Sequence, residues 1–460
     1  MIYLTADIGS TYTKLVAIDT LSGSIIGTAC AFTTIETDVR EGFYAALNKL
    51  ESSAGKLAYD QLLCCSSAAG GLKMVALGLV PELTAKAARL AASSAGAKVV
   101  KTYSFEISKA EQLEIENISP DLVLLCGGTD GGNKEVITAN AKRLCDIQGN
   151  FAIVIAGNKS ASHELQEIFE NSGKEFVITE NVMPEFNKLN IEPARKRIEE
   201  LFISRIIDAK GLSSLQKMCS HEIIPTPLAV MRACELLSKG ADEESGIGDL
   251  LAVDLGGATT DIYSMSDGHP SLDNMLSKGL PEPYAKRSVE GDLGMRYSLS
   301  SLKDVTDVKI ISAYADVSKE EAESWISRCL SNPDIVAEPG TPQQRVEEAV
   351  ARIAVEVATE RHSGIVESVY TPLGQMFALT GKDLSEVPAV IGIGGAIINS
   401  QNPTSILEGA RYNTQRYMYA KPRNPRYMVD AKYIFASMGL LSNANKSLAL
   451  RIIKKELKNI

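Results

Sequence analysis

Two short segments of the chain place an acidic residue beside a turn rich in glycine and small hydroxyl side chains. The first runs from Asp7 to Lys14 (DIGSTYTK) and the second from Asp254 to Asp261 (DLGGATTD). Glycine lets the main chain approach phosphate closely, and backbone N–H groups with Ser and Thr hydroxyls donate hydrogen bonds to anions. Two such turns facing each other would hold a polyphosphate from both sides. The candidate ligands within them are Gly9, Ser10, Thr11, Thr13, Gly256, Gly257, Thr259 and Thr260.

The carboxylates of these segments suit a cation better than a phosphate, because like charges repel. Asp7 and Asp254 are therefore predicted to bind a hydrated Mg²⁺, which takes oxygen ligands and keeps several of its waters. Asp261 is a candidate to orient or deprotonate an attacking water. For Lys14, a phosphate contact and an outward-pointing strand lysine are both open. One such segment alone would be an ordinary turn with a capping aspartate, but the paired copies favour phosphate binding.

The spacing of the two segments indicates a duplication. A constant offset of 247 residues places Asp7 on Asp254 and Gly9 on Gly256. Apolar, β-prone runs flank both turns, so each is predicted to join two strands of a hairpin. The expected strands are 2–7, 14–19 and 25–32 in the first half, and 250–254 and 262–265 in the second.

A second correspondence extends the duplication. Residues 120–128 and 388–395 each read as a buried strand that ends in Gly-Gly. We therefore expect two related α/β domains, 1–245 and 246–460, that bind a nucleotide in a cleft between them. Most of the remaining chain reads as helix, including 346–361 with Thr341 as its cap and Pro342 at its first position. The less regular segments 66–118 and 269–340 would hold insertions.

Composition excludes several classes of function. A chain of 460 residues exceeds one ordinary core, and two domains are the default expectation. A net charge of −10 argues against nucleic-acid and anionic-membrane partners, which need a cationic face. The start has no signal-peptide pattern and no run of 18 apolar residues occurs, so no membrane span is expected. The eight cysteines are scattered without a C-x-x-C pair, which is typical of reduced thiols in the cytoplasm.

The motifs resemble those of the actin, heat-shock-chaperone and sugar-kinase superfamily. Residues 7–19 are similar to its first phosphate motif, 254–261 to its second, and 391–396 to its adenosine motif. The resemblance implies a duplicated actin-like (ribonuclease H-like) α/β fold that binds ATP with Mg²⁺. It also implies that Gly394 and Gly395 lie beside the adenosine, whereas the phosphate contacts come from Ser10, Thr11, Gly256, Gly257 and Thr259.

Longer blocks across the whole chain resemble a narrower group, the glutamate mutase accessory protein family, often called MutL or GlmL. The blocks are 126–133, 179–185, 189–195, 224–227, 246–251 and 288–294. The resemblance implies an ATP-driven, chaperone-like factor that reactivates an adenosylcobalamin-dependent mutase. The chain lacks the D-x-H-x-x-G motif by which many mutases ligate cobalt. We therefore do not expect the chain to bind the cofactor through such a histidine, and we expect it to bind the mutase instead.

Several alternatives stay open at this point. The same fold serves small-molecule kinases, nucleotide-binding scaffolds, and redox activators that bridge an iron–sulfur cluster, for which Cys126 and Cys64–Cys65 would be the candidates. Segment 127–133 reads either as a nucleotide or partner contact or as a strand-to-helix turn capped by Asp130. Segment 290–292 reads as a surface turn or as a loop that lines the cleft or contacts a partner. The identity of the mutase and the presence of a homo-oligomer are not decided by the sequence.

Overall fold

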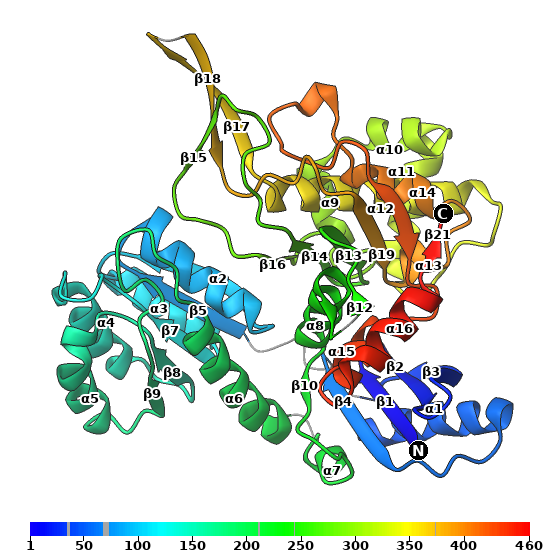
Figure 1. Ribbon diagram of the computed structural model, residues 1–460, viewed down its shortest axis with the longest axis horizontal. Helices are drawn as coiled ribbons and strands as arrows, with labels where there is room; N and C mark the ends of the chain where they lie inside the picture. Colours follow the sequence, from blue (N-terminus) through cyan, green and yellow to red (C-terminus); the bar gives the residue numbers. More distant parts are fainter. Residues whose placement is uncertain (35–36, 68–72, 210–211, 243, 373) are drawn as a thin grey trace. The chain divides into compact units, whose positions relative to one another are not determined.

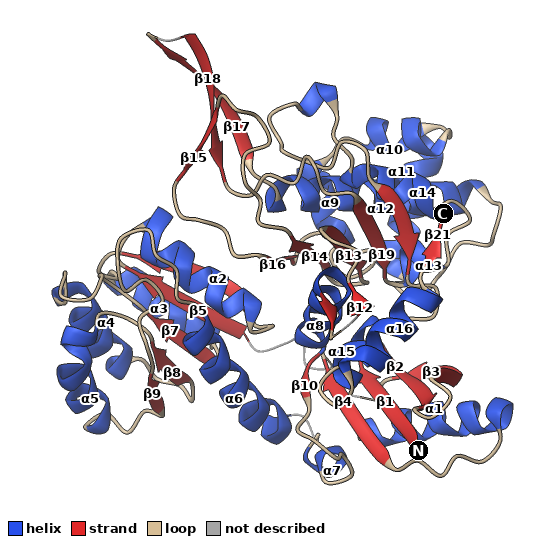
Figure 2. Cartoon of the chain, viewed as in Figure 1, coloured by secondary structure: helices blue, strands red, loops and turns tan. Residues whose placement is uncertain are grey.

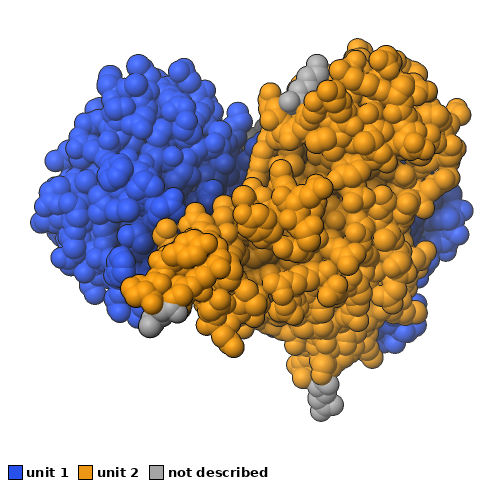
Figure 3. Space-filling view, turned by 90° about the horizontal axis from the view of Figure 1, so that it is seen from above, with its two compact units in different colours: residues 1–232, 279–281, 436–448 blue, residues 233–278, 282–435, 449–460 orange. Residues whose placement is uncertain are grey.

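The computed structural model (Figure 1) describes residues 1–460 except 35–36, 68–72, 210–211, 243 and 373. Contacts divide the chain into two compact units, coloured blue and orange in Figure 3. Unit 1 comprises 1–232, 279–281 and 436–448, and unit 2 comprises 233–278, 282–435 and 449–460. The predicted boundary between two domains, 1–245 and 246–460, remains a prediction.

The first sheet of unit 1 carries the predicted hairpin. Its strands, in spatial order, are β10 (Ile224–Pro225), β4 (Gln61–Ser66), β1 (Ile2–Ile8), β2 (Tyr12–Asp19) and β3 (Ser24–Phe32). β1, β2 and β3 pair antiparallel, as expected for consecutive strands joined by tight turns, whereas β4 runs parallel to β1 and to β10. Helix α1 (Val39–Ala54), capped by Asp38, buries Phe43 and Leu50 against this sheet.

The second sheet of unit 1 is wholly parallel, with helices on both faces (Figure 2). Its strands are β6 (Lys98–Ser104), β5 (Lys73–Gly78), β7 (Leu122–Leu125), β8 (Ala152–Ile155) and β9 (Phe176–Ile178), in that order. Counted along the chain, this is the doubly wound order 2-1-3-4-5. Alternate residues of the strands face two different cores. The central strands β7 and β8 are therefore buried on both faces and are apolar throughout. The sheet occupies the predicted insertion and extends well beyond residue 118.

The helices of unit 1 fall into two groups around that parallel sheet. One face is covered by α2 (Lys86–Ser94) and α6 (Glu192–Ala209), and the other by α3 (Lys109–Ile118), α4 (Glu135–Asp146) and α5 (Ser162–Glu170). The remaining elements are η1 (Pro81–Ala85), η2 (Lys159–Ala161), α7 (Ser213–Gln216) and the start of α8 (Thr226–Lys239).

The main sheet of unit 2 repeats the hairpin sheet of unit 1. Its order is β16 (Ala285–Glu290), β14 (Thr260–Met265), β13 (Leu250–Leu255), β19 (Ala389–Ile393), β20 (Arg426–Val429) and β21 (Lys458–Asn459). β13, β14 and β16 pair antiparallel, and β19 runs parallel to β13 and to β20. The duplicated α/β fold predicted from the sequence is therefore confirmed in its core.

Helix α12 (Pro342–His362) is the longest helix over this sheet, and its start agrees with the prediction. The Thr341 hydroxyl accepts a hydrogen bond from the Gln344 N–H, and Pro342 is the first helical residue. The other helices of unit 2 are η3 (Leu299–Ser301), α9 (Leu302–Val305), α10 (Val308–Ala315), α11 (Lys319–Ser331), α13 (Gly395–Ile398), α14 (Pro403–Leu407), η4 (Glu408–Ala410), η5 (Thr414–Arg416) and most of α16 (Lys446–Glu456). Helix α15 (Phe435–Leu441) belongs to unit 1 except for its first residue, and the start of α16 also belongs to unit 1.

Two small sheets complete unit 2. β11 (Gly240–Ala241) pairs with β12 (Glu244–Ser245). A three-stranded sheet, in the order β15 (Met275–Lys278), β18 (Gly374–Thr380) and β17 (Ile365–Thr371), projects from the unit in Figures 1 and 2.

The predicted equivalence of segments 120–128 and 388–395 is wrong. The strand in 388–395, β19, lies next to β13 in the hairpin sheet, whereas the strand in 120–128, β7, belongs to the separate parallel sheet. The structural counterpart of β19 is β4, which runs parallel to β1. The error has a physical cause: any buried parallel strand followed by glycines has the same local pattern, and only long-range pairing decides its sheet.

Candidate functional site

The two predicted turns have the same backbone geometry. In each, the N–H of the first glycine donates to the carbonyl oxygen three residues later, Gly9 to Tyr12 and Gly256 to Thr259, both at 3.0 Å. The register also matches, since Asp7 lies opposite Lys14 and Asp254 lies opposite Asp261. The offset seen in the sequence is therefore a structural equivalence.

The closure of each turn leaves little room for a side chain at its first glycine, least of all at Gly9. A Cβ atom on Gly9 would lie 2.6 Å from the Tyr12 carbonyl oxygen, and one on Gly256 would lie 3.2 Å from that of Thr259. Gly257 has no neighbour closer than 3.9 Å around its Cβ position. Its backbone thus stays open on that side, as an anion-binding N–H needs.

The first carboxylate is held by side chains from two strands and a helix. Asp7 is 6% exposed, and its Oδ1 accepts from the Thr226 hydroxyl at 2.6 Å and from Cys65 Sγ at 3.6 Å. Lys14 Nζ lies 3.6 Å from Oδ2. Lys14 thus points toward the carboxylate rather than simply outward. Burial first, and the neighbouring Asp7 charge second, raise the pKa of Cys65, which keeps it a neutral thiol.

The contact from Thr226 was not anticipated, because Thr226 lies at the start of α8, far away in the sequence. A hydrogen bond to a buried carboxylate contributes about 1.5–3 kcal/mol. We expect Thr226→Val to lower the free energy of unfolding by that amount, whereas Thr226→Ser retains the hydroxyl and most of the stability. Urea unfolding followed by circular dichroism measures both. Equal stability of the valine and serine variants would contradict the assigned contact.

The candidate hydroxyl ligands differ in exposure. Thr13 and Thr260 are both fully buried, with Thr13 bonded to the Thr33 hydroxyl and Thr260 to the Leu293 carbonyl oxygen. Ser10 is exposed and Thr11 is partly exposed. Ser10 and Thr11 are therefore better placed for an incoming ligand, and the phosphate contacts of all these residues remain predictions.

The second turn contains an ion pair that the sequence did not reveal. Arg287 on β16 reaches Asp261 Oδ1 with Nε at 2.8 Å and with Nη2 at 2.6 Å, and the Thr259 hydroxyl donates to Oδ2 at 3.1 Å. Arg287 is only 5% exposed. Burial opposes its charge, but the Asp261 carboxylate more than compensates and raises the pKa of Arg287. Local sequence carries no signal for this pair, because it depends on the pairing of β14 with β16.

A loop after β16 packs directly on the second turn. The N–H groups of Arg296 and Tyr297 both donate to the Gly257 carbonyl oxygen, at 2.8 and 2.9 Å. A Cβ on Gly294 would lie 2.3 Å from the Ala258 carbonyl carbon. Segment 290–292 belongs to this loop, and Arg361 of α12 binds the carboxylates of Glu290 and Asp292 at 2.7–2.9 Å. Segment 290–292 is thus held by α12 within the part of the chain that packs on the second turn. This placement does not decide between the two roles predicted for the segment.

The predicted adenosine motif lies at the end of β19, beside the second turn. Gly394 has φ of +95°, and a Cβ there would lie 2.3 Å from the Leu255 carbonyl oxygen at the end of β13. Gly395 begins α13, and the Tyr433 hydroxyl lies 2.7 Å from its Cβ position. The structure therefore brings the motif next to the strand that carries Asp254. Contact with adenosine remains a prediction.

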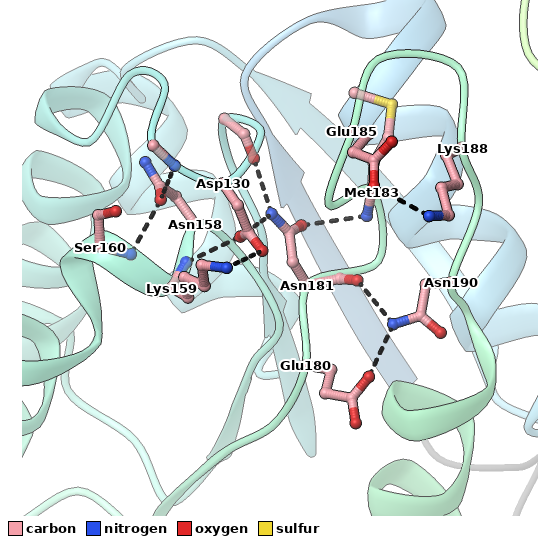
Figure 4. A network of polar contacts seen from close by, with 12 residues as sticks. Asp130, Asn158, Lys159, Ser160, Glu180, Asn181, Met183, Glu185, Lys188 and Asn190 are labelled. Carbon is pink, nitrogen blue, oxygen red and sulfur yellow. Dashed lines mark hydrogen bonds and ion pairs between the residues drawn. The ribbon is translucent and has the colours of Figure 1, made fainter.

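Segment 127–133 has a bracing role in the structure. Of the two alternatives left open for this segment, capping of α4 by Asp130 is wrong, because that helix begins only at Glu135 and the Asn133 side chain bonds its first turn. Instead, Asp130 Oδ1 accepts from the Lys159 N–H and from Asn181 Nδ2, both at 3.0 Å (Figure 4). Burial alone would raise the pKa of Asp130, but these hydrogen bonds outweigh burial and lower the pKa. Asn158 Oδ1 accepts from the Gly131 N–H at 3.0 Å, so loops after β7, β8 and β9 are tied together.

The cysteines required by a redox activator are buried. Cys64, Cys65 and Cys126 are at most 1% exposed, and burial raises the pKa of Cys126. Among the described residues, no group of three or more His, Cys, Asp or Glu side chains could hold a metal ion by itself. A hydrated Mg²⁺ needs only one or two carboxylates, and its binding by Asp7 and Asp254 stays a prediction. In the described part of the chain, no helix is long and apolar enough to cross a membrane.

Comparison with known proteins gives one strong and several weak similarities. The chain matches the model of a family described as MutL protein over residues 3–457. Protein MutL of Clostridium tetanomorphum is 46% identical over 458 residues, which cover 99% of each chain. Gluconate kinase from Lactobacillus acidophilus covers 100% of this chain and 92% of its own at 9% identity, with a TM-score of 0.35. A glycerol dehydratase reactivase covers 96% of this chain and 100% of its own at 9% identity, with a TM-score of 0.34. Structural likenesses of this size carry no information on function.

Proposed function

The chain belongs to the MutL protein family, and on that premise we propose that it is an ATP-dependent reactivating factor for an adenosylcobalamin-dependent mutase such as glutamate mutase. The observation that carries the ATP part is the shared register of the two glycine turns, each beginning at an aspartate. The family carries the mutase part. The factor would act in the cytoplasm, with the mutase as its partner.

In this proposal each unit supplies one phosphate-binding turn. The Gly257 backbone N–H and the exposed Ser10 hydroxyl would donate to phosphate oxygens, whereas the Gly9 N–H closes its own turn. Asp7 and Asp254 would hold hydrated Mg²⁺, which supplies charge neutralisation at the phosphates. Gly394 and Gly395 would lie beside the adenosine.

Asp261 has a more constrained role than a free general base. Both of its oxygens are engaged, one by Arg287 and the other by the Thr259 hydroxyl. Because that hydroxyl donates its proton to Asp261, its oxygen lone pairs are left to accept a hydrogen bond from water or to face a cation. We infer that Asp261 first orients Thr259 and through it the attacking water, and that Arg287 is the positioning residue that fixes Asp261.

The factor would reactivate the mutase by binding it with different affinity in its two nucleotide states. A radical mutase that has lost its adenosyl group retains an inert cobalamin in a closed site. A protein whose ATP-bound and ADP-bound states bind the mutase with different affinity can shift the mutase toward an open state and release the damaged cofactor. A small-molecule kinase is the alternative, in which the phosphoryl group passes to a metabolite.

ATP turnover measured with and without damaged mutase separates these two functions. We expect hydrolysis to rise when mutase carrying cobalamin without its adenosyl group is added, with no metabolite present. Mutase activity should return when free adenosylcobalamin is also supplied. Asp267→Asn, which changes an exposed carboxylate just after the end of β14, is the matched control and should behave as the unmodified protein. A high rate that needs one metabolite and no mutase would overturn the proposal.

A further inference from the structure

The projecting sheet of β15, β17 and β18 exposes large apolar side chains on two of its strands. Tyr370 is 81% exposed, Leu276 60% and Val369 42%. Only a small cluster, centred on Met275, Leu379 and Ala420, anchors the sheet at its base.

The outer edge of β17 has unpaired backbone groups. At its first residues, the Val366 N–H turns away from β18 and donates to the Met418 carbonyl oxygen at 2.7 Å. In an antiparallel ladder, the backbone groups of alternate residues point to the same side. Ser368 and Tyr370 therefore also point outward, and within the described residues no hydrogen bond to their backbone from outside the β17–β18 pair is found.

This edge lacks the devices that usually protect a free strand. Its register with β18 is unbroken from Ile365 to Thr371, so no bulge interrupts it. It contains no lysine or proline, and Glu367 is its one charged residue. Such an edge is a template for another strand. We propose that β17 pairs antiparallel with β17 of a second copy of this chain, about a two-fold axis at Val369.

Self-pairing is favoured because one register satisfies both copies and the others do not. With the axis at Val369, Ser368 lies opposite Tyr370 of the second copy, and each pair exchanges both of its backbone hydrogen bonds. An axis at Ser368 would need Val366, whose N–H is already bonded to Met418. An axis at Tyr370 would place Ser368 opposite Pro372, which has no N–H.

The chemistry of the side chains agrees with the same register. The carboxylate of Glu367 falls opposite Thr371, so no two like charges meet across the pair. Val369 packs on its own equivalent, a β-branched contact suited to neighbouring strands. A short strand pair buries less area than a standard interface, and we therefore expect a dimer that forms in the micromolar to millimolar range.

Cysteine cross-linking tests the register directly. In a non-hydrogen-bonded antiparallel pair the Cα atoms are about 4.5 Å apart, which a disulfide can bridge. Val369→Cys should therefore give a disulfide-linked dimer under mild oxidation. Glu367→Cys is the matched control, because this residue shares the exposed face but lies opposite Thr371. The unmodified protein, whose Cys30 is exposed, sets the background.

Sedimentation measured over a range of concentrations supplies the second test. Val369→Lys places two ammonium groups at the axis and should weaken the dimer at least about tenfold, whereas Val369→Thr should keep it. Both variants should retain the circular dichroism spectrum and the ATP affinity of the unmodified protein. A single-chain mass at millimolar concentration, or equal cross-linking of the two cysteine variants, would overturn the proposal. Loss of mutase binding in Val369→Lys without any dimer would instead make the mutase the occupant of this edge.

Discussion

Replacing Asp261 with alanine is expected to lower the free energy of unfolding of unit 2 by about 3–5 kcal/mol, because it removes the carboxylate that pairs with the buried Arg287 guanidinium. The Arg287 side chain is 4% exposed and that of Asp261 is 11% exposed, so water screens the pair little. The chain has a single tryptophan, Trp325, in the core of unit 2. Its fluorescence during urea unfolding therefore reports on this unit.

The double variant Asp261→Ala/Arg287→Met is the control that isolates the ion pair. A methionine removes the buried charge and fills part of the space, so the double variant should recover much of the stability lost in Asp261→Ala. If the double variant were as unstable as the sum of the two single variants, the ion pair would have no net role in the fold. Any loss of hydrolysis in Asp261→Ala must be compared at temperatures where unit 2 remains folded.

Replacing Asp254 with alanine is expected to weaken the binding of Mg·ATP by about 10–100-fold, because a carboxylate that orders the waters of a bound metal contributes that much to its affinity. ATP binding measured by calorimetry, with Mg²⁺ and with EDTA, tests this. The effect should appear only with Mg²⁺ present. Without the metal, removal of a negative charge near the phosphates should leave ATP affinity unchanged or slightly higher.

The matched control for Asp254 is Asp267→Asn, which removes a carboxylate from the opposite end of the same hairpin. It should leave the Mg²⁺ dependence intact. A variant Asp254→Ala that bound ATP equally well with and without Mg²⁺, at the affinity of the unmodified protein, would remove Asp254 from the metal site. That result would leave the family membership untouched and would move the question to Asp7.

The sequence by itself determined the features that depend on neighbours along the chain. The two glycine turns, the strands that flank them and the cap of α12 were predicted because each is set by a few consecutive residues. The repeat at a constant offset was enough to predict that Asp7 and Asp254 are equivalent. The longer blocks were enough to predict the family.

Only the tertiary structure decided which distant residues complete these turns. Thr226 reaches Asp7 across more than two hundred residues, and Arg287 reaches Asp261 through the register of two strands. For the same reason, the sequence did not predict that β7 belongs to a separate parallel sheet or that Asp130 connects several loops. A local pattern fixes the conformation of a segment, but side-chain partners and strand neighbours are chosen by long-range packing and pairing.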